Sequence, residues 1–212
     1  MGKIFYGMPR TRSFRVLWML EEIGAQYEYR LVNLGKGGGQ TPEFLQLNPA
    51  GKLPAMVDGD LVLTESAAIC IHLAESAPGR KLIPAAGTAD RAHCNQWCFF
   101  VLAELEQPLW TIAKHKFALP KDYRVREVLE TATFEFARAV RLLDIGLKER
   151  DYLVDGNFCV ADLLAAHTLT WAKAFKMDLG SDNLDAYLAR NCRREAWLRA
   201  ERIERQKEGE MK

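Results

Sequence analysis

The period of the hydrophobic pattern changes near residue 80, and this change constrains the fold more than any other feature of the chain. Before that point, a strand-like alternation such as residues 27–31 follows a helical stretch such as 13–23. After residue 90 the apolar residues recur with the period of a helix to the end of the chain. A chain of 212 residues with this change predicts two small domains, an α+β domain followed by an all-α helical bundle.

The first domain is expected to be one sheet with helices packed on it, in the order strand, helix, strand, helix, strand, strand, helix. We predict strands at 3–6, 27–31, 53–57 and 61–63, and helices at 13–23, from 41, and at 66–75. Asp58-Gly59 signals a hairpin between the last two strands. These boundaries predict an N-terminal domain at 1–78.

Pro84, two glycines and several small residues mark 79–89, which we interpret as the linker to a helical domain at 90–212. Helices are predicted at 91–115, with a kink at Pro108, and at 124–148, 162–175, 184–190 and 194–204. The most apolar of them, 162–175, is expected at the centre of the bundle. Residues from Arg205 onward are charged and are expected to fray.

Charge and cysteine content exclude several classes of function. The formal net charge is +1, so the chain has no bulk attraction for nucleic acid or anionic lipid. No run of about 18 apolar residues could span a membrane, and the first residues do not resemble a signal peptide. The five cysteines are odd in number and include no C-x-x-C pair, which predicts reduced, buried thiols, no metal site and a cytoplasmic location.

The stretch from Asn48 to Ile69 carries most of the chemical information. Pro54 at the head of a strand cannot donate to a sheet, so it belongs at an edge or in a cis peptide that turns the backbone of Leu53 toward a ligand. Glu65 and Ser66 precede a helix and bring together a carboxylate, a hydroxyl and free backbone N–H groups. A ligand with an extended backbone and an α-amino acid end would fit both places. The alternative is a plain hairpin followed by a capped helix.

The run Asn48-Pro49-Ala50-Gly51-Lys52-Leu53-Pro54, then Asp58-Gly59 and Leu63-Thr64-Glu65-Ser66-Ala67-Ala68-Ile69, resembles the cytosolic glutathione S-transferase family, in particular its bacterial, zeta-, theta- and beta-like members. The resemblance implies a thioredoxin-like N-terminal domain, a helical C-terminal domain and glutathione as co-substrate. It further implies a homodimer in which each N-terminal domain meets the partner's helical domain.

The resemblance also assigns roles by position. The backbone of Leu53 would bind the cysteinyl part of glutathione next to a cis Pro54, and Glu65 with Ser66 would hold the γ-glutamyl end. Lys52 would lie near the glycyl carboxylate, although a solvated surface lysine is the alternative. Arg12 stands where several classes have the catalytic Ser or Cys, which leaves the mechanism open.

Thiol activation requires a donor, because a thiol with a pKa near 8.5 is mostly protonated at neutral pH. Ser13 at the helix start is the first candidate, and Tyr6 at the strand end and Thr11 are the others. Arg12 or Arg10 could stabilise a thiolate by charge. The alternatives are a helix cap for Ser13 and a core aromatic for Tyr6.

Two further groups are predicted with structural alternatives. The walls of a co-substrate pocket are predicted at Met8, Trp97, Phe100, Trp110 and His115, although aromatic residues at helical spacing are more often core. Cys159 and Asp162 match a capping box at the start of the central helix, with a thiol where the family usually has a hydroxyl.

The predicted function is conjugation of glutathione to a small apolar electrophile. Two alternatives stay open: a glutathione-dependent isomerase, reductase or dehalogenase on the same fold, and a weakly catalytic regulatory module that binds glutathione. The sequence does not name the electrophile.

Overall fold

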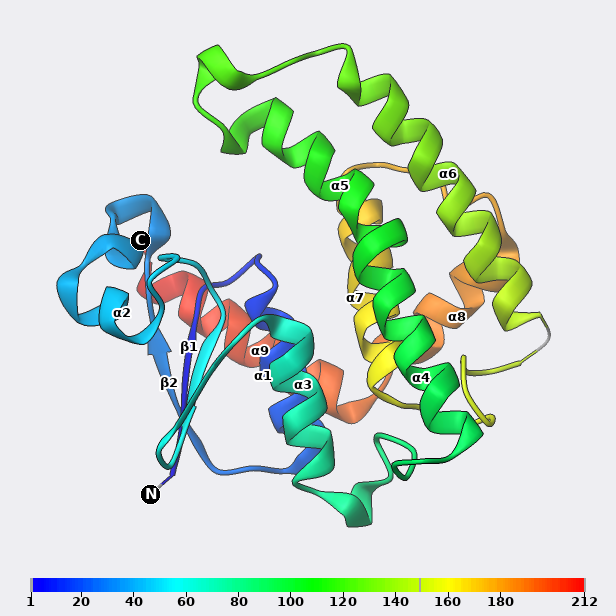
Figure 1. Ribbon diagram of the computed structural model, residues 1–212, viewed down its shortest axis with the longest axis horizontal. Helices are drawn as coiled ribbons and strands as arrows, with labels where there is room; N and C mark the ends of the chain where they lie inside the picture. The colour runs from blue at the N-terminus through cyan, green and yellow to red at the C-terminus, as the bar shows by residue number, and fades with distance from the viewer. Residues whose placement is uncertain (1, 149, 212) are drawn as a thin grey trace. The chain divides into compact units, whose positions relative to one another are not determined.

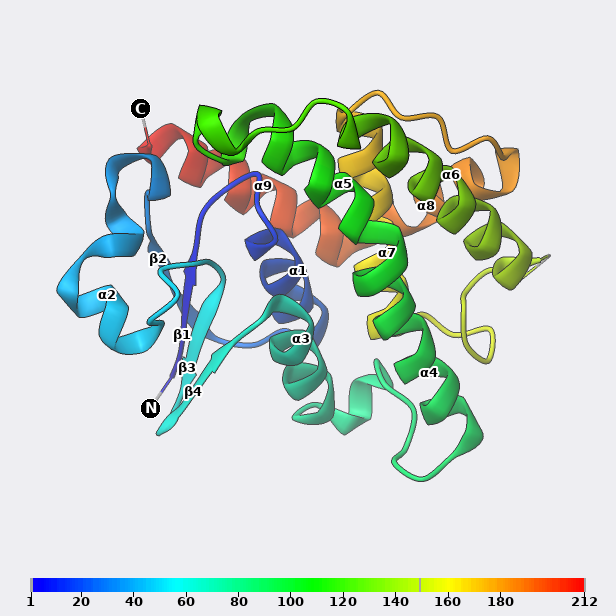
Figure 2. The same ribbon diagram turned by 45° about the horizontal axis from the view of Figure 1, so that its top comes forward.

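The computed structural model describes residues 2–148 and 150–211. The chain forms two compact units, shown in Figures 1 and 2. The first contains the residues up to Ile83 together with those from Cys192 onward, and the second contains Pro84–Asn191. The boundary near residue 83 falls within the predicted linker, but the last 20 or so residues pack with the N-terminal unit rather than with the predicted domain at 90–212.

The first unit is built on a four-stranded mixed sheet with the strand order β2-β1-β3-β4. Its strands are β1 (Lys3–Gly7), β2 (Tyr27–Leu31), β3 (Ala55–Asp58) and β4 (Leu61–Thr64). β1 pairs with β2 in parallel, whereas β1 with β3 and β3 with β4 are antiparallel. This is the thioredoxin-like arrangement that the sequence predicts. The third strand begins two residues later than expected, because Leu53 and Pro54 lie outside it.

Helices cover both faces of this sheet (Figure 2). The helices α1 (Ser13–Ile23) and α3 (Ser66–Glu75) lie together on one face, and α2 (Pro42–Leu47) lies on the other. Tyr6, Phe44 and Ala55 form the apolar cluster under α2. The predicted stop after α1 is confirmed, because Gly24 adopts a left-handed φ of 66° and its N–H returns to the helix carbonyls.

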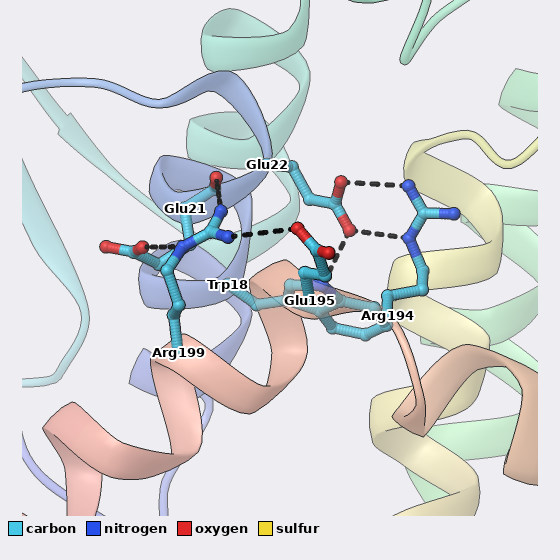
Figure 3. Close-up of polar contacts among 6 residues, drawn as sticks. All are labelled: Trp18, Glu21, Glu22, Arg194, Glu195 and Arg199. Atoms are coloured by element: carbon cyan, nitrogen blue, oxygen red, sulfur yellow. Dashed lines mark hydrogen bonds and ion pairs between the residues drawn. The ribbon is translucent and has the colours of Figure 1, made fainter.

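The last helix, α9 (Glu195–Glu210), packs along α1. Trp197 is buried and meets the rings of Phe14 and Trp18 edge to face, at centroid distances of 4.6 and 4.7 Å. Figure 3 shows the polar contacts around this packing: Arg194 binds the carboxylate of Glu22, and Arg199 binds Glu21. This packing continues the helix to Glu210, beyond the predicted end at Glu204, and the expected fraying from Arg205 is therefore wrong.

The second unit is helical, as predicted. A continuous helical stretch runs through α4 (Ala89–Phe100), a π-helical turn at Val101–Leu105, α5 (Glu106–Ala113) and a second π-helical turn at Lys114–Ala118. The first π-turn comes just before Pro108, which has no N–H to give to the carbonyl four residues earlier. The chain thus accommodates Pro108 with a wider, π-helical turn at the place of the predicted kink. The other helices are α6 (Val128–Leu147), α7 (Val160–Ala174) and α8 (Asp182–Cys192).

The central helix is α7, and Asp162 fixes its start. The predicted capping box of Cys159 and Asp162 is present. The fully buried Asp162 carboxylate accepts hydrogen bonds from the backbone N–H groups of Leu153 and Cys159 at 2.9 and 3.0 Å, and from the Tyr187 hydroxyl at 2.9 Å. Burial raises the pKa of Asp162 above its ordinary value, against the effect of these hydrogen bonds. One side chain thus joins the preceding loop, α7 and α8.

Within the described residues, no helix is both long and apolar enough to cross a membrane. The five cysteines are free thiols, and four of them are buried, namely Cys70, Cys94, Cys98 and Cys159. Cys192 is half-buried, which differs from the expectation that all five lie in the core.

We expect Asp162→Ala to lower the free energy of unfolding by about 3 kcal/mol, because it leaves two buried N–H donors without an acceptor. Urea denaturation of the full chain measures this loss. Asp185→Ala is the control, since Asp185 forms an exposed ion pair with Lys173, and such a pair is worth about 1 kcal/mol or less. If Asp162→Ala lowered the free energy of unfolding no more than the control does, Asp162 would not be the residue that holds the preceding loop, α7 and α8 together.

The carboxylate of Asp58 accepts hydrogen bonds from Lys3 at 2.6 Å and from His72 at 3.0 Å, and these bonds hold the pKa of Asp58 below its ordinary value. We expect Asp58→Asn to cost about 1 kcal/mol at pH 7. Because the folded pKa is the lower one, this stability is present above about pH 4 and is lost as the pH falls through the folded pKa. The difference from wild type, measured by thermal unfolding, should therefore shrink in acid. The exposed neighbour Asp60, changed to Asn, should show neither effect.

Candidate functional site

The registers of the sheet bring three chain segments to one of its ends. Ala55 lies opposite Tyr6 of β1 and opposite Thr64 of β4. The loop after β1, the residues before β3 and the residues after β4 therefore leave the sheet at the same end. They contain the predicted residues of the first unit: Tyr6, Met8, Thr11, Arg12, Ser13, Lys52, Leu53, Pro54, Glu65 and Ser66.

The segment before β3 presents free backbone groups. The Leu53–Pro54 peptide is cis, as the sequence suggested. Among the hydrogen bonds of the described residues, none involves the backbone N–H or C=O of Leu53. Lys52 is exposed, and its carbonyl accepts from the side chain of the buried Asn48 at 2.7 Å. Asn48 thereby holds the turn that presents Lys52 and Leu53. Sequence analysis assigned Asn48 no role of its own, and the available signal for one was its polar side chain in a turn-forming run.

The residues after β4 form the second part of the site. Glu65 precedes α3 with a φ of 66°, a left-handed backbone conformation that costs a residue other than glycine about 1–3 kcal/mol. Its side chain is exposed and makes no cap contact with the helix. Ser66 is buried, and its hydroxyl accepts from Arg15 at 3.3 Å. A carboxylate on a strained backbone, beside the open N–H groups at the start of a helix, suits a ligand that carries both an ammonium and a carboxylate.

Arg15 is fully buried under this corner. Its backbone carbonyl accepts from the Cys70 thiol at 3.4 Å, so α1 and α3 are joined by both the side chain and the main chain of this residue. Sequence reasoning assigned Arg15 no role. Nothing in the sequence around it shows that the guanidinium lies in the core.

The loop before α1 places the three candidate hydroxyls differently. Ser13 is 1% exposed, and its hydroxyl accepts from the Met8 N–H at 3.2 Å and contacts the Thr11 hydroxyl at 2.8 Å. Arg12, and not Ser13, is the residue that precedes the helix, so Ser13 is not the cap. Thr11 is half-buried, and its hydroxyl contacts the Met8 carbonyl at 2.7 Å.

Tyr6 lies in the cluster under α2, with its ring 5.9 Å from that of Phe44. Its hydroxyl accepts from Arg30 on the neighbouring strand β2 at 2.9 Å. The alternative that the sequence left open for Tyr6, a core aromatic, describes this environment.

The predicted co-substrate residues of the second unit have contacts within the bundle. Trp97 stacks edge to face on Phe100 at 5.3 Å and packs directly on Gly146 of α6, where a Cβ atom would collide with the indole. His115 accepts from the Val125 N–H at 2.9 Å and so closes the loop after α5. Trp110 is half-buried in α5. Trp97 and His115 therefore have structural roles inside their own unit.

Two hollows lie elsewhere. A cavity of about 320 Å³ beside α9 is lined by Glu22, Arg80, Arg194, Glu195, Ala196 and Arg199. A groove of about 280 Å³ between α5 and α6 is lined by Ala103, Glu104, Gln107, Pro108, Glu135, Arg138, Ala139 and Leu142. Neither contains a predicted site residue. Among the described residues, no group of three or more His, Cys, Asp or Glu side chains gathers as metal ligands would.

The fold and this corner define a class of protein, a thioredoxin-like domain joined to a helical domain. Residues 1–75 match the glutathione S-transferase N-terminal domain, and residues 106–195 match the glutathione S-transferase C-terminal domain. The chain belongs to the glutathione S-transferase family.

Relatives and solved structures show what the chain is similar to. A zeta-class glutathione S-transferase of Euphorbia esula is 37% identical over 66% of this chain and 63% of its own length. The disulfide-bond oxidoreductase YfcG of Escherichia coli is 32% identical over 74% of each chain. The crystal structure of a Pseudomonas putida glutathione transferase, with one glutathione disulfide bound per subunit, has a TM-score of 0.83 and 25% identity, covering 94% of this chain and 90% of that one.

Proposed function

We propose that the chain binds glutathione at the end of its sheet and joins it, through its sulfur, to a small apolar electrophile. The observation that carries the proposal is the juxtaposition of the unpaired Leu53 backbone with the strained, exposed Glu65 and the start of α3. The Leu53 groups suit the cysteinyl backbone, Glu65 suits the γ-glutamyl ammonium, and the N–H groups at Ser66 suit its carboxylate. Lys52 is exposed next to Leu53 and would attract the glycyl carboxylate.

In this proposal the thiol of glutathione lies against the loop between β1 and α1. Thr11 is favoured over Ser13 and Tyr6, because it is half-buried while they are buried. Its hydroxyl and the positive end of the α1 dipole would both favour the thiolate. The thiolate then attacks the electrophilic carbon, a carbon–sulfur bond forms, and the leaving group departs with the bonding electron pair. The functional unit would be a homodimer in the cytoplasm, as in the family.

Reduction of disulfides is the second candidate, and the similarity to YfcG favours it. In that reaction the bound thiolate attacks a disulfide, so that a mixed disulfide with glutathione forms and one thiol leaves. A second glutathione then attacks the mixed disulfide, which gives glutathione disulfide and releases the second thiol. Purified protein assayed with glutathione and an aryl halide, and separately with glutathione and hydroxyethyl disulfide, distinguishes the two reactions. Turnover of the halide supports conjugation, and turnover of the disulfide alone supports reduction. Glutathione binding without either turnover would support the regulatory module.

We expect Glu65→Ala to weaken glutathione binding by about 10- to 100-fold, the equivalent of a lost charge-assisted contact of about 1.5–3 kcal/mol. Isothermal titration calorimetry measures the affinity. Glu65→Gln should weaken binding as well, because it removes the charge and keeps the shape. The matched control is Glu43→Ala, since Glu43 is an exposed acid on α2 of the same unit. Unchanged affinity in a folded Glu65→Ala protein would rule out the corner as the γ-glutamyl site.

We expect Thr11→Ala to raise the pKa of the bound glutathione thiol by about one unit, which corresponds to 1.36 kcal/mol of lost preference for the thiolate. Thiolate absorbance of bound glutathione against pH gives this value. Thr11→Ser should retain the wild-type pKa, because it keeps the hydroxyl. Ser13→Ala disturbs the same hydrogen-bonded loop without removing the Thr11 hydroxyl, and should shift the thiol pKa less than Thr11→Ala does. Equal shifts in Thr11→Ala and Ser13→Ala would assign the effect to the loop rather than to the Thr11 hydroxyl.

A further inference from the structure

The C-terminal half of α9 reaches the loop that precedes α1. The Glu204 carboxylate accepts the backbone N–H of Arg10 at 2.9 Å. The Glu208 carboxylate pairs with the Arg10 guanidinium, with Nε at 2.7 Å. Arg10 is held at a φ of 60°, in the left-handed region that favours glycine. A backbone N–H and a side chain of one residue are thus bound by two acids one helical turn apart on α9.

Glu208 binds the side chain of Arg10, whereas Glu204 binds its backbone N–H. The Arg10 side chain is 83% exposed, so its pair with Glu208 is a surface ion pair of small effect. Glu204 is half-buried, and burial raises the pKa of its carboxyl above the ordinary value. It holds the main chain of Arg10, directly before Thr11. The contact that shapes the loop is therefore the one with Glu204.

The first half of α9 keeps Glu204 in place. Trp197 is packed between Phe14 and Trp18 of α1, and the two arginine–glutamate contacts of Figure 3 flank it. Beyond Glu208, the Met211 carbonyl accepts from Lys36 at 3.5 Å, in the segment that follows β2. The helix is anchored on α1 at its start and contacts two loops at its far end.

We propose that Glu204 is a positioning residue for thiol activation: by holding the Arg10 N–H it sets the loop so that the Thr11 hydroxyl faces the sulfur of bound glutathione. The inference rests on the proposed function. Thr11 is tied to Met8 and Ser13 by its own hydrogen bonds, so the loop moves as one piece when its anchor at Arg10 is released. Leu53, Glu65 and Ser66 belong to other segments and do not depend on that anchor.

The test uses the full chain and separates activation from binding. Glu204→Ala should raise the measured pKa of the bound glutathione thiol by about one unit, which is a tenfold loss of thiolate well below that pKa. Its affinity for S-methylglutathione, which has no thiol, should stay within about twofold, a difference of less than 0.5 kcal/mol. Glu204→Gln should restore the wild-type pKa, because its amide oxygen still accepts the Arg10 N–H. Glu208→Ala should resemble wild type, because it keeps the Glu204 contact with the Arg10 backbone.

Three results from the variants would overturn the inference. One is a Glu204→Ala thiol pKa equal to that of wild type. Another is an equal shift in Glu208→Ala, which would assign the effect to charge rather than to the backbone contact. The last is a parallel loss of S-methylglutathione affinity, which would show a merely structural role. If Glu204→Ala does not fold, Glu204→Asp takes its place, since it withdraws the carboxylate by one methylene. A wild-type protein that binds S-methylglutathione but leaves the thiol pKa at its free value would overturn this inference and leave the binding site standing, whereas no binding at all would overturn both.

Discussion

The antiparallel pairing of β3 with its two neighbours is the constraint on which the candidate site depends. Ala55 is held opposite Tyr6 on one side and Thr64 on the other. This register brings Leu53, which precedes β3, close to Glu65, which follows β4. A shift by one residue would turn the buried Ala55 and Met56 toward the opposite face and separate the two halves of the corner. Backbone hydrogen bonds of the sheet therefore bring Leu53 and Glu65 to the same end of the hairpin.

Two residues with unusual backbone conformations lie where this sheet end meets its loops. Glu65 and Arg10 both have a positive φ without being glycine, and such conformations persist only where the surroundings enforce them. Arg10 is enforced by acids from α9, and the corner at Ser66 is supported from beneath by the buried Arg15. The N-terminal unit thus relies on its C-terminal helix for the shape of a loop nearly 200 residues earlier in the chain, at a sequence separation of 194.

Sequence analysis predicted the elements well because the periods of their apolar residues are strong. The strand at 27–31, the helix ending at Gly24 and the capping box at Asp162 all rest on local chemistry, and the structure confirms each. The loop before α1 depends less on local chemistry. Ser13 looked like the first residue available to a ligand, but its hydroxyl is turned inward to Met8. Which way a hydroxyl points depends on how the loop closes, and a single sequence holds no local signal for that.

The sequence by itself determined the thioredoxin-like order of strands and helices, the helical second half and the motif around Leu53 and Glu65, because these depend on neighbours within a few residues. Only the tertiary structure decided that α9 joins the N-terminal unit, that Glu204 holds Arg10, and that Arg15 lies in the core. An amphipathic pattern states which face of a helix is buried but not which surface buries it. That choice is made by the shape and charge of the whole fold, as Trp197 between Phe14 and Trp18 illustrates.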